Sequence, residues 1–298
     1  MNALLIGLLA ATAAQGPVDS RCEPELVSGK AGEGQTMFHG LSPDGRELAV
    51  GWESGSGESI RRGAFILDLR SGRRTDLPHL NNAPSFSPDG RYLVSASYRD
   101  EQGLQTEVIE LDRKSGKARS YASNKATEWL ASYSRNGRWI LFNSMRTGGS
   151  DLYRVERATG KIEQLSSAPT YEAQAQYFDR DRQILFHRNV KDDDYDVAIL
   201  DTRTGQSRSV GATPLEEAYP AMSRDGRWIA YSAVAAAGEP PNLHVMKPDG
   251  SGRVRLTKGT VQDAYATWSP DGRFVYFVRF HKEGGRIYRL RVKDGHCP

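Results

Sequence analysis

The stretch Ser87-Pro88-Asp89-Gly90-Arg91 decides the fold, because close copies of it return along the whole chain. The other copies are Ser42-Pro43-Asp44-Gly45-Arg46, Ser134-Arg135-Asn136-Gly137-Arg138, Ser223-Arg224-Asp225-Gly226-Arg227 and Ser269-Pro270-Asp271-Gly272-Arg273, with a degenerate copy at Asp179-Arg180-Asp181-Arg182-Gln183. Successive copies begin 44 to 47 residues apart. Proline presets φ at the second position of a β-turn, aspartate suits the third, and glycine accepts a positive φ. Each copy therefore predicts a type I turn that closes a hairpin.

Strand-like sequence surrounds each of these turns. A large apolar residue precedes the turn in every copy, namely Leu41, Phe86, Tyr133, Phe178, Met222 or Trp268. Apolar, β-branched and aromatic runs follow it, at residues 48–50, 92–94, 139–142, 184–186, 228–231 and 274–277. A third and a fourth strand can then be read in the same order in nearly every unit. Six units of four antiparallel strands, with a period in the forties, predict an all-β, six-bladed β-propeller.

An aromatic or apolar residue followed by Ser-Pro-Asp-Gly resembles the hallmark of the TolB-like, WD40-like β-propeller repeats. The resemblance covers about residues 25–298 and rests on the five well-kept copies of the motif. It implies a propeller fold. It leaves the function open, because proteins of this family include both binding proteins and enzymes.

Composition and the N-terminal residues predict where the protein works. The 298-residue chain has a formal net charge of +3, which is too small to indicate a nucleic-acid partner. Residues 4–14 form an apolar run that ends in small residues, which predicts a signal peptide over residues 1–14. The run is too short for a membrane span, which needs about 20 apolar residues. We therefore expect a periplasmic or secreted monomer without a membrane span, whose residues 15–298 form one propeller domain.

Cys22 and Cys297 lie near the two ends of the chain. The sixth repeat lacks a fourth strand, while Glu25-Leu26-Val27 precedes the first turn much as other fourth strands precede theirs. The N-terminal segment should therefore complete the sixth blade, which would bring the two cysteines together. A disulfide is normal in an exported protein. The alternatives are two free thiols or a pair of metal ligands.

Strand order assigns the connections to two faces. The Ser-Pro-Asp-Gly turns share one face, here called the turn face, where the arginines after the glycines form a solvated basic rim. Those arginines are Arg46, Arg91, Arg138, Arg227 and Arg273. The longer, more varied connections share the other face, here called the long-loop face, and include residues 53–62, 99–105, 189–195 and 234–241. Variable loops on a rigid frame are where recognition usually occurs.

Acidic residues recur on the long-loop side of the innermost strands. Glu128, Glu217 and Asp263 lie six residues before a turn serine, and Glu172 lies seven before Asp179. If the innermost strands line the channel, these carboxylates encircle its mouth and form a binding site. Converging carboxylates suit a calcium ion or a basic partner segment; otherwise no cofactor is expected. The alternative is that the four acids cap loops or face solvent.

Three further residues belong to the predicted channel mouth. Tyr219 and Tyr265, two residues beyond an acid, could add flat contact surface or pack between blades. His39 is on an innermost strand, where a single histidine is more often structural.

The sequence contains no Gly-x-Ser-x-Gly elbow, no Gly-rich phosphate loop followed by Lys and Ser/Thr, and no His-Glu-x-x-His pair, so no catalytic residues are assigned. The sequence therefore favours a non-enzymatic binding scaffold for protein or peptide partners of the bacterial envelope. The alternative is a propeller hydrolase or lyase that acts on a carbohydrate or small substrate at the channel mouth.

Overall fold

Each predicted turn is a tight hairpin held by its own serine. The Ser87 hydroxyl donates to Asp89 Oδ1 at 2.6 Å and accepts the Tyr92 N–H at 2.8 Å. The Gly90 N–H bonds to the Ser87 carbonyl at 2.8 Å, with a φ of 71° at the glycine. The turns that begin at Ser42, Ser134, Ser223 and Ser269 repeat this pattern. The serine and the acidic or amide residue are therefore needed for the turn itself.

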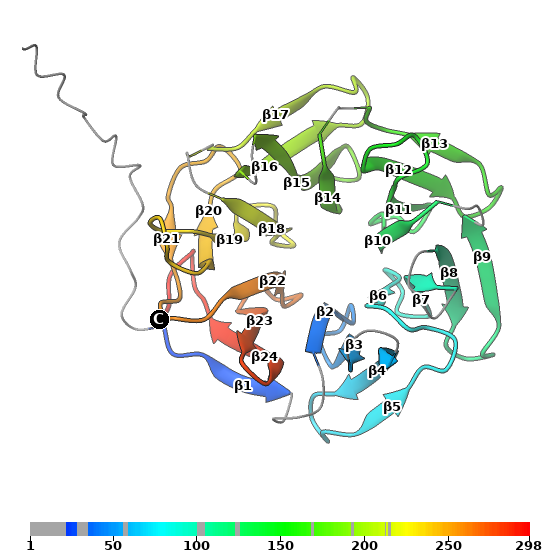
Figure 1. Ribbon diagram of the computed structural model, residues 1–298, viewed down its shortest axis with the longest axis horizontal. Helices are drawn as coiled ribbons and strands as arrows, with labels where there is room; N and C mark the ends of the chain where they lie inside the picture. Colours follow the sequence, from blue (N-terminus) through cyan, green and yellow to red (C-terminus); the bar gives the residue numbers. More distant parts are fainter. Residues whose placement is uncertain are drawn as a thin grey trace, which may run out of the picture.

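The computed structural model describes residues 22–28, 35–55, 59–99, 105–122, 126–167, 170–191, 194–211, 213 and 216–298, without the side chains of residues 35, 37–39, 122 and 191. The predicted signal peptide, residues 1–14, lies outside these ranges. Within them the strands form six four-stranded antiparallel sheets, arranged as a ring around a central channel (Figure 1). The six-bladed, all-β propeller predicted from the sequence is confirmed.

The first three blades run outward from the channel in chain order. Blade 1 contains β2 (Gln35–Leu41), β3 (Glu47–Ser54), β4 (Arg61–Asp68) and β5 (Arg74–Asp76). Blade 2 contains β6 (Ser85–Phe86), β7 (Tyr92–Tyr98), β8 (Thr106–Asp112) and β9 (Ala118–Ala122). Blade 3 contains β10 (Glu128–Tyr133), β11 (Trp139–Ser144), β12 (Asp151–Glu156) and β13 (Ile162–Gln164).

The last three blades follow the same plan, except that the sixth is completed from the other end of the chain. Blade 4 contains β14 (Glu172–Phe178), β15 (Gln183–Lys191), β16 (Asp194–Asp201) and β17 (Ser207–Ser209). Blade 5 contains β18 (Glu217–Met222), β19 (Ile229–Ala233), β20 (Asn242–Met246) and β21 (Val254–Arg255). Blade 6 contains β22 (Asp263–Trp268), β23 (Phe274–His281), β24 (Gly284–Arg291) and β1 (Glu25–Ser28).

Strand β1 closes the ring as predicted. It pairs antiparallel with β24, placing Glu25 opposite Arg289 and Leu26 opposite Tyr288. Figure 1 shows the two strands, blue and red, side by side. Cys22 and Cys297 are disulfide-bonded, with their Cα atoms 5.2 Å apart across a sequence separation of 275 residues. The predicted closing strand and the predicted disulfide are both confirmed.

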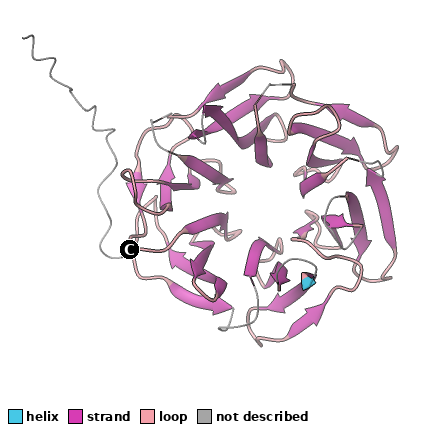
Figure 2. Ribbon diagram, viewed as in Figure 1, coloured by secondary structure: helices cyan, strands magenta, loops and turns pink. Residues whose placement is uncertain are grey.

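The core lies mainly between neighbouring blades, because each sheet is apolar on both faces. Trp268 of blade 6, for example, packs in one cluster with Ala230 and Val245 of blade 5. Its indole N–H also donates to the Ala221 carbonyl at 3.1 Å. Figure 2 shows that the described chain is almost entirely strand and loop. In that part of the chain, no helix has the length and apolar character needed to cross a bilayer.

The degenerate copy in blade 4 also forms a hairpin turn, but with a different backbone conformation and different hydrogen bonds. Asp179, Arg180 and Asp181 are three successive residues with positive φ, at 45°, 54° and 65°. The Asp181 carboxylate accepts the backbone N–H groups of Arg135, at 2.6 Å, and Asn136, at 3.0 Å. The altered turn therefore binds the neighbouring turn of blade 3.

Candidate functional site

Three adjoining cavities follow the channel from one face to the other. The first, here called the mouth pocket, lies on the long-loop face, has a volume of about 170 Å³ and is lined by Tyr171, His187, Tyr195, Tyr219 and Tyr265 among others. A middle cavity of about 130 Å³ shares Leu130, Gln174 and Tyr265 with it. The third, here called the turn-face pocket, has a volume of about 330 Å³ and shares Ser132 and Gln176 with the middle one.

A repeated β-bulge shapes the mouth end of the innermost strands. The pairing of β10, β14, β18 and β22 with their neighbours is interrupted near the same place in each blade. The residues with positive φ there are Leu130 (59°), Gln174 (56°), Tyr219 (54°) and Tyr265 (57°). Each lies two residues after one of the predicted acids. A bulge redirects side chains locally, so these four residues line the cavities.

The same bulges coincide with the burial of the acids inside their blades. Glu128, Glu172, Glu217 and Asp263 have only 0 to 2% of their surface exposed. Glu128 contacts Arg146 at 2.6 Å, Glu217 contacts Arg253, and Asp263 binds Arg279 through two hydrogen bonds of 2.7 and 2.8 Å. Glu172 instead accepts a hydrogen bond from the Ser166 hydroxyl. Glu128, Glu217 and Asp263 therefore pair within their own blades, whereas Glu172 of blade 4 is bound by Ser166, which also accepts the Leu152 N–H of blade 3.

The structure thus places the acids differently from the expectation that they encircle the mouth. Among the described residues, no group of three or more His, Cys, Asp or Glu side chains is arranged to hold a metal ion. Burial raises the pKa of Glu172 to about 6. Burial also raises the pKa of Glu217, although the Arg253 guanidinium opposes this effect. None of the four acids is among the residues that line the mouth pocket.

Aromatic side chains take the place of the acids at the mouth. Tyr219 and Tyr265 have ring centroids 4.4 Å apart, and their hydroxyl groups are hydrogen-bonded. His187 lies 5.3 Å from the Tyr219 ring and 5.5 Å from the Tyr195 ring, and Tyr171 lies 6.2 Å from Tyr195. The two tyrosines predicted for the mouth are therefore brought together there, in a larger aromatic group.

His187 is held as a neutral ring in this group. Its Nδ1 accepts the Tyr219 backbone N–H at 3.2 Å. Complete burial lowers the pKa of His187 to about 3. His39 is on β2, where it pairs with Val50, and its side chain lies outside the described residues.

Exposed apolar side chains continue outward from the mouth pocket. Met145, Tyr171 and Val190 are 44%, 41% and 50% exposed. Met145 and Tyr171 lie on connections of the long-loop face, and Val190 is the second-last residue of β15. Tyr171 stacks on Trp129, with centroids 6.3 Å apart, and its carbonyl accepts the Asn189 N–H at 2.8 Å. We call Met145, Tyr171 and Val190 the apolar rim.

Sequence reasoning missed the apolar rim and the contributions of Tyr171, His187 and Tyr195 to the mouth pocket. A usable signal was present for Tyr171, which directly precedes Glu172 at the end of an interblade connection. His187 and Tyr195 carry no such signal. They lie on β15 and β16, and they meet the innermost strands only when the blade is folded.

Solved structures share this fold at low sequence identity. TolB from Acinetobacter baumannii matches with a TM-score of 0.61 and 21% identity, over 88% of this chain and 56% of that chain. A protein from Agrobacterium tumefaciens, provisionally assigned to TolB, matches with a TM-score of 0.67 and 16% identity, over 87% and 91% of the two chains. Oligogalacturonate lyase in complex with manganese matches with a TM-score of 0.61 and 12% identity, over 90% of this chain and 79% of that chain. At these identities the similarities show the fold alone.

Sequence comparisons show the family. An uncharacterised protein of Agrobacterium fabrum is 29% identical over 134 residues, which are 44% of this chain and 43% of that protein. The chain thus spans about half the length of this relative and of the Acinetobacter TolB. A family model of the TolB β-propeller domain matches residues 31–240, more than half of the chain. The chain therefore belongs to the TolB β-propeller family.

Proposed function

We propose that the protein is an exported, non-enzymatic scaffold that binds a protein or peptide partner at the mouth pocket and the apolar rim. The observation that carries this proposal is the pair Tyr219 and Tyr265, which line the pocket although their backbones have positive φ. A positive φ is uncommon for bulky residues and costs about 1–3 kcal/mol. Such strain is concentrated at functional sites.

The chemistry of the pocket suits a peptide better than a free small molecule. Its volume of about 170 Å³ is below the range of roughly 300–1,000 Å³ typical of small-molecule sites. It can instead receive one side chain of a partner. Tyrosine is enriched among residues that dominate binding energy, and the apolar rim offers further contact area beside the pocket. We infer that an apolar or aromatic side chain of an exposed peptide segment is the anchor.

His187 and the four buried acids support binding over catalysis. General acid–base catalysis works best with a pKa near the working pH and a group within reach of the substrate. His187 has a pKa of about 3 and its Nδ1 is occupied by the Tyr219 N–H. The acids of the innermost strands are buried against partners of their own.

The alternative is a hydrolase or lyase that acts on a carbohydrate. Its support is the shared fold of oligogalacturonate lyase, which is 12% identical to this chain. Such a function would use the same channel mouth, so the experiment below includes it.

We further propose a periplasmic or extracellular location and a monomeric state, with residues 1–14 as signal peptide. The disulfide between Cys22 and Cys297 supports this location, because disulfides persist in oxidising compartments. The blades of a propeller leave only short, protected strand edges, which supports the monomeric state.

The test begins with a displayed library of random peptides selected against the purified protein. The affinity of the selected peptides is then measured for the wild type, Tyr171→Ala and Leu26→Ala. Leu26 is the matched control, because it is 56% exposed and lies on β1, on the outer side of the ring. We expect Tyr171→Ala to weaken binding roughly 10-fold or more, as loss of an aromatic anchor does, and Leu26→Ala to leave it unchanged.

Two results would contradict the proposal. One is equal affinity of the selected peptides for wild type and Tyr171→Ala. The other is turnover of a glycan or ester by the wild type that disappears in Tyr219→Gly, which would favour the enzymatic alternative.

A further inference from the structure

The arginines within the well-kept copies of the turn motif fall into two groups. The five that follow the turn glycines are each paired with a carboxylate: Arg46 with Asp44 (3.8 Å), Arg91 with Asp112 (2.8 Å), Arg138 with Glu156 (2.8 Å), Arg227 with Asp225 (2.7 Å) and Arg273 with Asp271 (2.7 Å). The predicted basic rim is therefore largely neutralised. A second group, Arg135 and Arg224, occupies the position that proline holds in the other well-kept copies of the motif.

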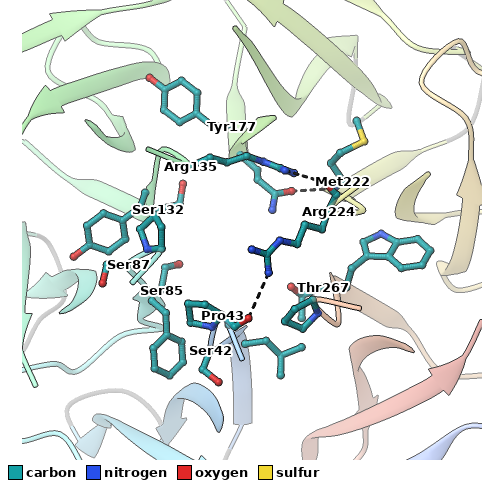
Figure 3. Close-up of a pocket in the computed structure, with 18 of the residues that line it drawn as sticks. Ser42, Pro43, Ser85, Ser87, Ser132, Arg135, Tyr177, Met222, Arg224 and Thr267 are labelled. Atoms are coloured by element: carbon teal, nitrogen blue, oxygen red, sulfur yellow. Dashed lines mark hydrogen bonds between the residues drawn. The ribbon is translucent and has the colours of Figure 1, made fainter. Parts of the chain in front are cut away.

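Arg135 and Arg224 point into the turn-face pocket rather than along the rim (Figure 3). Arg135 Nη1 donates to the Arg224 carbonyl at 2.8 Å, which links blade 3 to blade 5. Arg224 Nη1 donates to the Pro43 carbonyl at 3.4 Å, which reaches across to blade 1. Figure 3 shows the Arg224 side chain extending over the cavity toward Pro43. Both guanidinium groups are thus held in place at the channel end.

Neither guanidinium forms an ion pair with a described residue. The described residues that line the pocket include no Asp or Glu, so these two arginines are the charged groups among them. The nearest acids are engaged elsewhere: Asp181 accepts the backbone N–H groups of Arg135 and Asn136, and Asp225 binds Ser223 and Arg227. Burial, and next the charge of Arg224, lower the pKa of Arg135.

The two guanidinium groups keep most of their hydrogen-bonding capacity. Each carries five N–H donors in a planar fork, and one donor of each is used by the bonds above. Asp181, Asp179 and Asp225 are near enough to Arg135 to oppose part of its charge, but none of them lines the cavity. Two cations on such a cavity wall attract an anion, most strongly one with oxygens matched to the forks. The cavity of about 330 Å³ lies within the range of small-molecule sites.

We propose that the turn-face pocket binds a small doubly charged oxyanion through Arg135 and Arg224. The shared chemistry is two negative charges on a compact ligand, carried either by two carboxylates or by a phosphate group. This site lies at the opposite end of the channel from the mouth pocket. It is independent of the peptide-binding function proposed above.

The experiment measures binding of two probes, succinate and inorganic phosphate, by isothermal titration calorimetry on the full chain at low ionic strength, where screening is weak. The variant is Arg224→Pro, which restores the residue found at Pro43, Pro88 and Pro270 and so suits the turn. The matched control is Arg273→Gln, which removes a paired arginine of the same face. A second variant, Arg135→Gln, keeps the backbone N–H that donates to Asp181.

We expect at least one probe to bind the wild type, with the tighter probe showing whether carboxylates or phosphate are preferred. Loss of one charge-assisted contact should weaken that binding roughly 10-fold or more in Arg224→Pro and in Arg135→Gln, but not in Arg273→Gln. The proposal is overturned if neither probe binds, if both pocket variants bind as the wild type does, or if chloride at equal ionic strength produces the same heats.

Discussion

Asp263 and Arg279 form a two-point ion pair inside the sixth blade, Nε to Oδ1 at 2.7 Å and Nη2 to Oδ2 at 2.8 Å. The carboxylate is almost fully buried, and the guanidinium also lies over the rings of Phe277 and Tyr288. Glu217 with Arg253 and Glu128 with Arg146 repeat the relationship in blades 5 and 3. These three acids therefore connect the innermost strand to the rest of its own blade.

Replacing Arg279 by Gln is expected to lower the free energy of unfolding by about 3–5 kcal/mol, because the Asp263 carboxylate stays buried without its partner. The exposed pair of Arg273 with Asp271 is the control, and Arg273→Gln should cost less than about 1 kcal/mol. Urea unfolding monitored by tryptophan fluorescence measures the unfolding free energies of both variants. An equal loss of unfolding free energy in the two variants would show that burial does not increase the cost of breaking the ion pair.

Removing the disulfide is expected to lower stability strongly. On the chain-entropy model, a loop of this length contributes roughly 5–6 kcal/mol at most, because the bond restricts the unfolded chain. The double variant Cys22→Ser/Cys297→Ser should therefore melt well below the wild type, and a reducing agent should lower the wild type to the same Tm. An unchanged Tm in both experiments would contradict this expectation.

Glu172 should make stability depend on pH. Its pKa is about 6 in the folded chain and 4.5 in its ordinary state, so the folded state binds the proton more tightly. The resulting stabilisation is complete below about pH 4.5 and is lost as the pH rises through about 6, a change of about 2 kcal/mol. Glu172→Gln removes this dependence, so its stability relative to the wild type should be higher at pH 7.5 than at pH 4.

The control for that experiment is Glu163→Gln. Arg154 and Lys161 hold the pKa of Glu163 below its usual range, so its contribution is lost as the pH falls, the opposite direction. Chemical unfolding at both pH values measures the two variants against the wild type. If the stability of both variants relative to the wild type changed in the same direction between the two pH values, burial would not be what sets the pKa of Glu172.

The positive φ at Tyr219 predicts an unusual order of stability among its variants. Glycine adopts this conformation without the cost that a Cβ brings, so Tyr219→Gly should be about 1 kcal/mol more stable than Tyr219→Ala. Tyr195 lines the same pocket on regular strand β16, where glycine should instead be the less stable of the two. Thermal unfolding of the four variants compares the two orders, and the same order at both sites would contradict the argument.

Much of the architecture follows from local sequence. Ser87, Asp89 and Gly90 make their turn almost entirely from bonds among themselves and to residues up to Tyr92, so the motif is readable wherever it occurs. Its even spacing then determines the number of blades. The missing fourth strand of the last repeat and the two terminal cysteines were enough to predict the closing strand and the disulfide.

The direction of the side chains was decided only by the tertiary structure. The spacing of Glu217 and Tyr219 was visible in the sequence. Only the structure shows that Glu217 is buried and that Tyr219 lies within a bulge and lines the pocket. Likewise, Arg135 and Arg224 look like ordinary substitutions of a turn proline. They become a pair because ring closure brings turns 89 residues apart to one channel end, where the nearby carboxylates already bind other groups.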